Sequence, residues 1–153
     1  MRLVDKKQKA KNESELIDKS GKREYTIIEI IVRCVVEHLL YTKLQPFLVD
    51  EKSLTERMGG QMSLWEECVR LFPREEIIED MNLALRKEDF TSLYALTHRL
   101  KGNLANFGFG QTSEKAADLM CAIREKDILR INSRYEVLKE EYLQIIGRIG
   151  EVK

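Results

Sequence analysis

Hydrophobic side chains recur at intervals of three and four residues through most of the chain after residue 50. This spacing places them on one face of an α-helix, whereas a strand would require strict alternation. The longest such run is typical of a helix packed in a bundle, and it consists of Ile128, Ile131, Tyr135, Leu138, Tyr142, Ile145 and Ile149. The connections between the helical segments are short, which favours antiparallel neighbours. The pattern therefore predicts an all-α fold, an up-down antiparallel helical bundle with a four-helix core.

A more apolar segment precedes the predicted bundle. Residues 25–43 are rich in Ile, Val and Leu and carry a charge at every fourth position, at Glu29, Arg33 and Glu37. On a helix these charges form one stripe whose i,i+4 pairs are stabilising, although the β-branched run also fits a strand. We expect an additional N-terminal helix that ends near Pro46. The apolar surface of such a helix must be covered by the bundle, by a second copy of the chain or by another protein.

Composition divides the chain into three parts. Residues 1–24 carry eight basic and five acidic residues and few apolar ones, which predicts a charged, disordered tail. The tail is too charged for a signal peptide. Residues 25–46 are then the apolar helix, and residues 47–150 are the helical bundle.

Charge and cysteine content exclude several classes of function. The 26 Lys and Arg residues balance 26 Asp and Glu residues, so no net field attracts nucleic acid or an anionic membrane. Residues 27–40 are too short and too charged to span a bilayer, which needs ~20 mostly apolar residues. Three widely spaced cysteines favour a reducing cytoplasm over a disulfide framework. Cys34 and His38 lie at i and i+4, but without a second pair we expect no metal site.

Residues 90–107 are predicted to form a helix, capped by Asp89 and ended by Gly108, with one bare face. At about 100° per residue, His98 lies about 140° from the centre of the core stripe, which consists of Leu93, Leu96, Leu100, Leu104 and Phe107. The neighbours of His98 on its own face have mostly small side chains, and they are Tyr94, Ala95, Lys101, Gly102 and Ala105. Glycine inside a helix costs about 1 kcal/mol relative to alanine, so Gly102 calls for a functional reason.

This combination of residues suits phosphoryl transfer. A neutral imidazole is a good nucleophile near pH 7 because its unperturbed pKa is ~6.5, and Lys101 can offset the incoming charge through a charge-assisted hydrogen bond. Gly102 lets a partner's backbone approach closely. We predict that His98 is the phosphoacceptor and that the partner docks on Tyr94, Ala95, Arg99 and Ala105.

The segment "HRLKGNLANFG", residues 98–108, resembles the H-x-L-K-G-S-x-A-N-L-G signature of histidine-containing phosphotransfer (HPt) domains. The similarity extends over about residues 50–148, through "LTERMGG", "LWEECVRLF" and "NLALRKEDFTSLYALTH". Asn103 stands where Ser is common, and Thr112 stands where an apolar residue is usual. Neither departure affects the expected phosphoacceptor.

The resemblance implies a phosphorelay carrier in a two-component system. His98 would take a phosphoryl group from the aspartate of one response-regulator receiver domain and pass it to another, including a receiver of a hybrid histidine kinase. Mg²⁺ would belong to the receiver, so no cofactor is expected on this chain. Nothing resembles an ATP-binding kinase region. The alternative is a non-catalytic adaptor that docks receiver or kinase domains and dimerises through residues 27–41; the donor, the acceptor and the oligomeric state stay open.

Overall fold

The structure is a computed structural model that describes residues 26–72 and 76–151, without the side chains of residues 33–38. The predictions for the tail (residues 1–24) and for the Cys34–His38 pair therefore lie outside the described residues. The helices are α2 (Ile27–Leu44), η1 (Gln45–Phe47, a 3₁₀ turn), α3 (Glu51–Arg57), α4 (Met62–Leu71), α5 (Glu76–Arg86), α6 (Phe90–Asn106), α7 (Gly110–Glu125) and α8 (Ile128–Glu151). No strand occurs in the described ranges, so the all-α prediction is confirmed.

Two compact units divide the chain inside α2, one ending at Val36 and the other beginning at Glu37. The described part of the first unit is the start of α2, where Thr26 and Glu29 form a capping box. The Thr26 amide donates to Glu29 Oε2 at 2.8 Å, and the Glu29 amide donates to Thr26 Oγ1 at 3.1 Å. Satisfying these amides favours a helix over a strand in this β-branched run. The exposed large apolar side chains here are Ile27, Ile28, Ile30, Ile31 and Val32.

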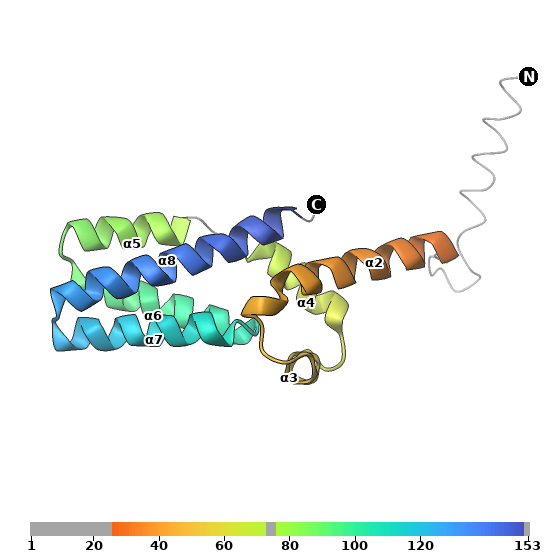
Figure 1. The fold of residues 1–153 in the computed structure, drawn as a ribbon, viewed down its shortest axis with the longest axis horizontal. Helices are drawn as coiled ribbons and strands as arrows, with labels where there is room; N and C mark the ends of the chain where they lie inside the picture. Colours follow the sequence, from red (N-terminus) through yellow and green to blue (C-terminus); the bar gives the residue numbers. More distant parts are fainter. Residues whose placement is uncertain (1–25, 73–75, 152–153) are drawn as a thin grey trace, which may run out of the picture. The chain divides into compact units, whose positions relative to one another are not determined.

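The second unit contains the four-helix core of α5, α6, α7 and α8 (Figure 1). Each of these helices packs against the next one in the chain, as the short connections predict. The longest buried seam is that of α8, and its members are Ile131, Tyr135, Leu138, Tyr142, Ile145 and Ile149. Ile128 is 52% exposed, contrary to the predicted seam, because it is the first residue of α8, at the end of the bundle.

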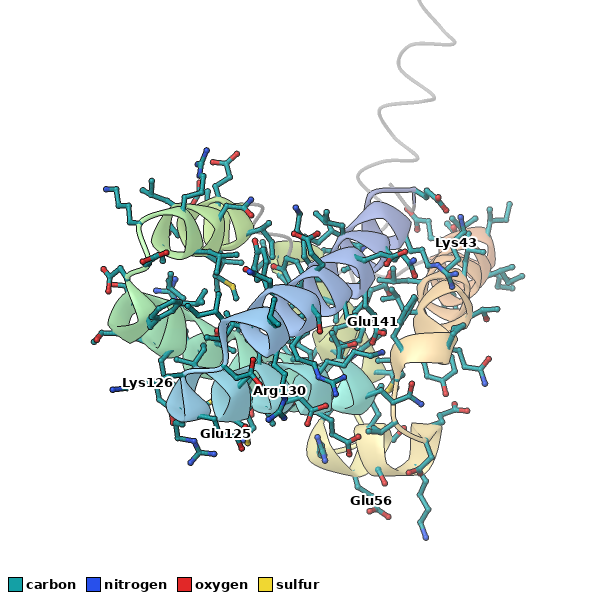
Figure 2. All side chains as sticks on the ribbon, turned by 60° about the vertical axis from the view of Figure 1, so that its left-hand side comes forward. Lys43, Glu56, Glu125, Lys126, Arg130 and Glu141 are labelled. Atoms are coloured by element: carbon teal, nitrogen blue, oxygen red, sulfur yellow. The ribbon has the colours of Figure 1, made fainter. Side chains whose placement is uncertain are left out.

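Polar contacts join α8 to α5 and to α7. The Tyr135 hydroxyl of α8 donates to Asn82 Oδ1 of α5 at 2.6 Å, and burial raises the pKa of Tyr135 to about 12. Between α7 and α8, buried Thr112 donates to Glu141 Oε1 at 2.5 Å, which explains how a polar residue is accommodated where an apolar one was expected. Figure 2 shows Glu141 on α8, and it shows Glu125 and Arg130, which form an ion pair across the α7–α8 turn.

The core stripe of α6 differs from the predicted one. Leu93, Leu100 and Leu104 are buried as predicted, but Leu96 and Phe107 are only half-buried. Thr97 is fully buried instead, and its hydroxyl donates to the Leu93 carbonyl oxygen at 2.7 Å. This bond within the helix satisfies the hydroxyl, so its burial carries little penalty. Compared with the predicted stripe, the buried face of α6 is therefore shifted toward Thr97 and away from Leu96.

Candidate functional site

Both ends of α6 are fixed by local contacts that the sequence predicts. Asp89 is the N-cap, and its carboxylate accepts hydrogen bonds from the Ser92 amide at 3.0 Å and the Ser92 hydroxyl at 2.7 Å. These bonds hold the pKa of Asp89 below its usual value. Gly108 follows the C-cap with φ +87°, a conformation that favours glycine, and a Cβ there would lie 2.8 Å from the Leu54 side chain.

The predicted site residues all lie on α6, and His98 is near its middle. His98, Ala95 and Gly102 are exposed, while Lys101 and Ala105 are half-buried. Because they follow one another at intervals of three and four residues, they share one face of the helix. The face therefore presents an exposed imidazole with a lysine one turn away and few bulky side chains around it.

Gly102 is required neither by the backbone nor by packing within the described chain. Its backbone is helical, and no atom outside its own helical turn lies within 4 Å of the position that a Cβ would occupy. An alanine would fit there and would stabilise the helix. The open space beside Gly102 thus lies outside the folded chain, on the face that carries His98.

Two side chains from other helices bond to backbone carbonyls of α6 beside the site. Ser113 of α7, which is buried, donates its hydroxyl hydrogen to the Lys101 carbonyl oxygen at 3.1 Å. Arg57 of α3 donates from Nη1 to the Ala105 carbonyl oxygen at 2.7 Å. Sequence reasoning missed both residues, because only the folded chain brings α3 and α7 against α6. No local signal in the sequence could have found them.

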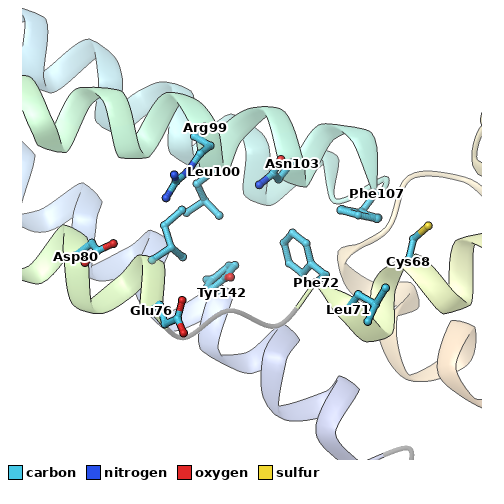
Figure 3. Close-up of a pocket in the computed structure, with 11 residues that line it drawn as sticks. Cys68, Leu71, Phe72, Glu76, Asp80, Arg99, Leu100, Asn103, Phe107 and Tyr142 are labelled. Carbon is cyan, nitrogen blue, oxygen red and sulfur yellow. The ribbon is translucent and has the colours of Figure 1, made fainter.

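Tyr94 and Arg99 lie toward opposite neighbours of α6. A hydrogen bond to Cys121 raises the pKa of Arg124 on α7, and the electrostatic effects of Cys121 and Tyr94 raise it further. Because Tyr94 acts on Arg124 in this way, Tyr94 lies close to α7. Arg99 points toward α5 (Figure 3). The two predicted docking residues therefore stand on either side of the His98 face.

A pocket of about 690 Å³ lies beside this face, between α4, α5, α6 and α8 (Figure 3). Its floor is aromatic, because the ring of Phe72 lies 5.0 Å from Phe107 and 5.8 Å from Tyr142, centroid to centroid. Arg99 and Asp80 are among the charged residues that line it. Because Glu76 and Asn103 also line it, the pocket next to the α6 face is of mixed polar and apolar character.

The charged residues of α6 are all basic. The helix contains Arg99 and Lys101 but no Asp or Glu between Phe90 and Asn106, although the whole chain carries 26 residues of each sign.

Within the described residues, no group of three or more His, Cys, Asp or Glu side chains is arranged to hold a metal ion. Nor does the described part include a helix long and apolar enough to cross a membrane.

The comparisons with known proteins give one family. Residues 74–147 match the model of the Hpt domain, a range that contains α5, α6 and α7 and most of α8. The comparisons with curated proteins and with solved structures gave no match. His98 and Lys101 lie inside the matched range, whereas α3 and α4 precede it. Over residues 74–147 the chain is thus similar to Hpt domains, a family that performs histidine phosphotransfer in two-component phosphorelays and interacts with receiver domains.

Proposed function

We propose that this chain is a phosphorelay carrier, with His98 accepting a phosphoryl group from the aspartate of one response-regulator receiver and passing it to a second receiver. The observation that supports the proposal most is the exposure of His98 near the middle of α6, with Lys101 and Gly102 one turn further along the same face. An exposed imidazole is reachable by a macromolecular donor. The small side chains around it let that donor come close.

In the proposed forward step, a neutral ring nitrogen of His98 attacks the phosphorus of the aspartyl phosphate. An N–P bond forms while the bond from phosphorus to the aspartate oxygen breaks, and the aspartate leaves as a carboxylate. The reverse sequence of bond changes delivers the group to the next receiver. Such transfers depend mainly on positioning and charge stabilisation.

Lys101 is the residue that we assign to charge stabilisation. It lies one turn from His98, and its ammonium group can donate a charge-assisted hydrogen bond to a phosphoryl oxygen. Gly102 is assigned to close approach of the partner, and Tyr94, Ala95, Arg99 and Ala105 are assigned to docking. The Mg²⁺ that the reaction needs is assigned to the receiver. Because nothing in the sequence resembles an ATP-binding kinase region, the proposed phosphate donor is a phosphoprotein and not ATP.

The proposal is tested with the full chain and purified receiver domains charged with radiolabelled phosphate. We expect the label to move to the chain, to be labile in acid and stable in base as phosphohistidine is, and to move on to a second, unphosphorylated receiver. A chain that binds receivers but stays unlabelled by every charged receiver from its own organism would instead be a non-catalytic adaptor.

A further inference from the structure

We propose that Arg57 extends the docking surface of α6 onto α3, where its guanidinium group binds carboxylates at the rim of an acidic receiver site. The inference rests on the proposed function, because it assumes that the partner is a receiver. Arg57 lies before residue 74, so it is outside the part of the chain that matches the Hpt family model.

The position of Arg57 follows from one hydrogen bond. Its Nη1 atom lies 2.7 Å from the carbonyl oxygen of Ala105, which follows His98 by seven residues, two turns or about 10 Å along the helix axis. A standard protein interface covers about 800 Å² on each partner. A receiver centred on His98 would therefore reach the guanidinium group at the C-terminal end of α6.

The bond to Ala105 is not needed to satisfy that carbonyl group. The Ala105 oxygen also accepts hydrogen bonds from the backbone amides of Phe107 and Gly108, the latter at 3.2 Å. Arg57 itself is exposed, and no ion pair to it is formed in the described part of the chain. Because a guanidinium group has five N–H donors, the others remain for a partner while this bond holds the group in place.

The charge of the surface determines the chemistry of the partner. Arg57, Arg99 and Lys101 bring three cations around the His98 face, and α6 itself has no acidic residue. Arg99 shares its pocket with Glu76 and Asp80 of α5, whereas neither Arg57 nor Lys101 forms an ion pair within the described residues. Glu56, the acidic residue next to Arg57 on α3, is exposed, and its Oε1 atom lies 3.9 Å from Lys52 Nζ, with which it forms an ion pair. Planar guanidinium groups bind carboxylates in a bidentate geometry. An acidic protein surface is the partner that these charges fit.

The test compares Arg57→Gln and Arg57→Lys with Arg134→Gln, a matched change of an exposed arginine on α8. The dissociation constant for a purified receiver domain and the kcat and KM of phosphoryl transfer are measured between 50 and 300 mM salt, values chosen around physiological ionic strength. We expect Arg57→Gln to raise the dissociation constant and KM about two- to fivefold at low salt, the range of an exposed ion pair, and to leave kcat unchanged. The difference should shrink at high salt, and Arg57→Lys should restore part of the affinity.

Three results would overturn the inference: unchanged binding by Arg57→Gln, an equal loss with Arg134→Gln, or a fall in kcat alone. Binding is measured separately from transfer, so the outcome for Arg57 does not depend on phosphate acceptance. A receiver that binds without phosphorylating His98 would refute the proposed function, and the effect of Arg57 on its affinity would still decide this inference.

Discussion

The hydroxyl group of Ser113 holds the backbone of Lys101, one turn after His98, through a 3.1 Å hydrogen bond to its carbonyl oxygen. This contact joins α7 to α6 beside Gly102, the residue that weakens the helix. We expect Ser113→Ala to lower the free energy of unfolding by about 1 kcal/mol, the net contribution of a typical intramolecular hydrogen bond. Urea denaturation measures the change. The matched control is Ser133→Ala, an exposed serine of α8, and a loss no larger than that of the control would show that the contact contributes nothing.

Gly102 and Gly147 form a natural pair for testing the role of the site glycine. Both are exposed glycines inside helices, and a Cβ at either position would have no atom within 4 Å. We expect Gly102→Ala and Gly147→Ala each to raise the free energy of unfolding by up to ~1 kcal/mol. Only the change at Gly102 should weaken receiver binding or slow transfer, and Gly102→Leu should do so severely. Normal transfer by a folded Gly102→Leu protein would contradict the proposed close approach.

Lys101→Ala should slow phosphoryl transfer on the order of tenfold, if its ammonium group contributes about 1.4 kcal/mol to the transition state. Stability should be nearly unchanged, because Lys101 is not one of the buried residues of the core. Rapid-quench kinetics with a charged receiver measure the rate. Lys87→Ala, at an exposed lysine after α5, is the control, and equal rates for the two variants would make Lys101 a bystander.

The N-cap of α6 makes part of the stability depend on pH. Hydrogen bonds from Ser92 lower the pKa of Asp89 in the folded chain. A depressed folded pKa stabilises the fold above the unfolded value of about 3.9, and this stabilisation is lost as the pH falls through the folded value. Asp89→Ala should therefore lower the free energy of unfolding at pH 7, and the deficit should diminish below about pH 4. Urea titrations across this range test the prediction, which a deficit independent of pH would contradict.

The sequence predicted the features that depend on local spacing. The helical periods, the N-cap at Asp89 and the end of α6 at Gly108 all follow from residues within a few positions of one another, and the structure confirms them. The helical state of α2 could have been predicted more firmly, because Thr26 and Glu29 carry the T-x-x-E signature of a capping box.

The features that the sequence did not predict depend on contacts between helices. Thr97 is buried because of the way in which α6 packs among its neighbours. The hydrogen bond from its hydroxyl group to the Leu93 carbonyl oxygen reduces the energetic penalty of burying a polar group. Arg57 bonds to Ala105, which lies 48 positions away in the sequence, and Ser113 bonds to Lys101, which lies 12 positions away. Periodicity indicates which face of a helix is buried, but it does not indicate which neighbouring side chain reaches a given carbonyl group.

The most direct test of the central claim is the location of the phosphate. The chain contains two histidines, so His98→Gln and His38→Gln form a matched pair, and both are incubated with the same charged receiver domain. We predict that His38→Gln accepts the label at the normal rate and that His98→Gln accepts none. Because His98 is exposed, His98→Gln should unfold at nearly the temperature of the unmodified chain. Normal labelling of the His98→Gln protein would contradict the assignment of His98 as the phosphoacceptor.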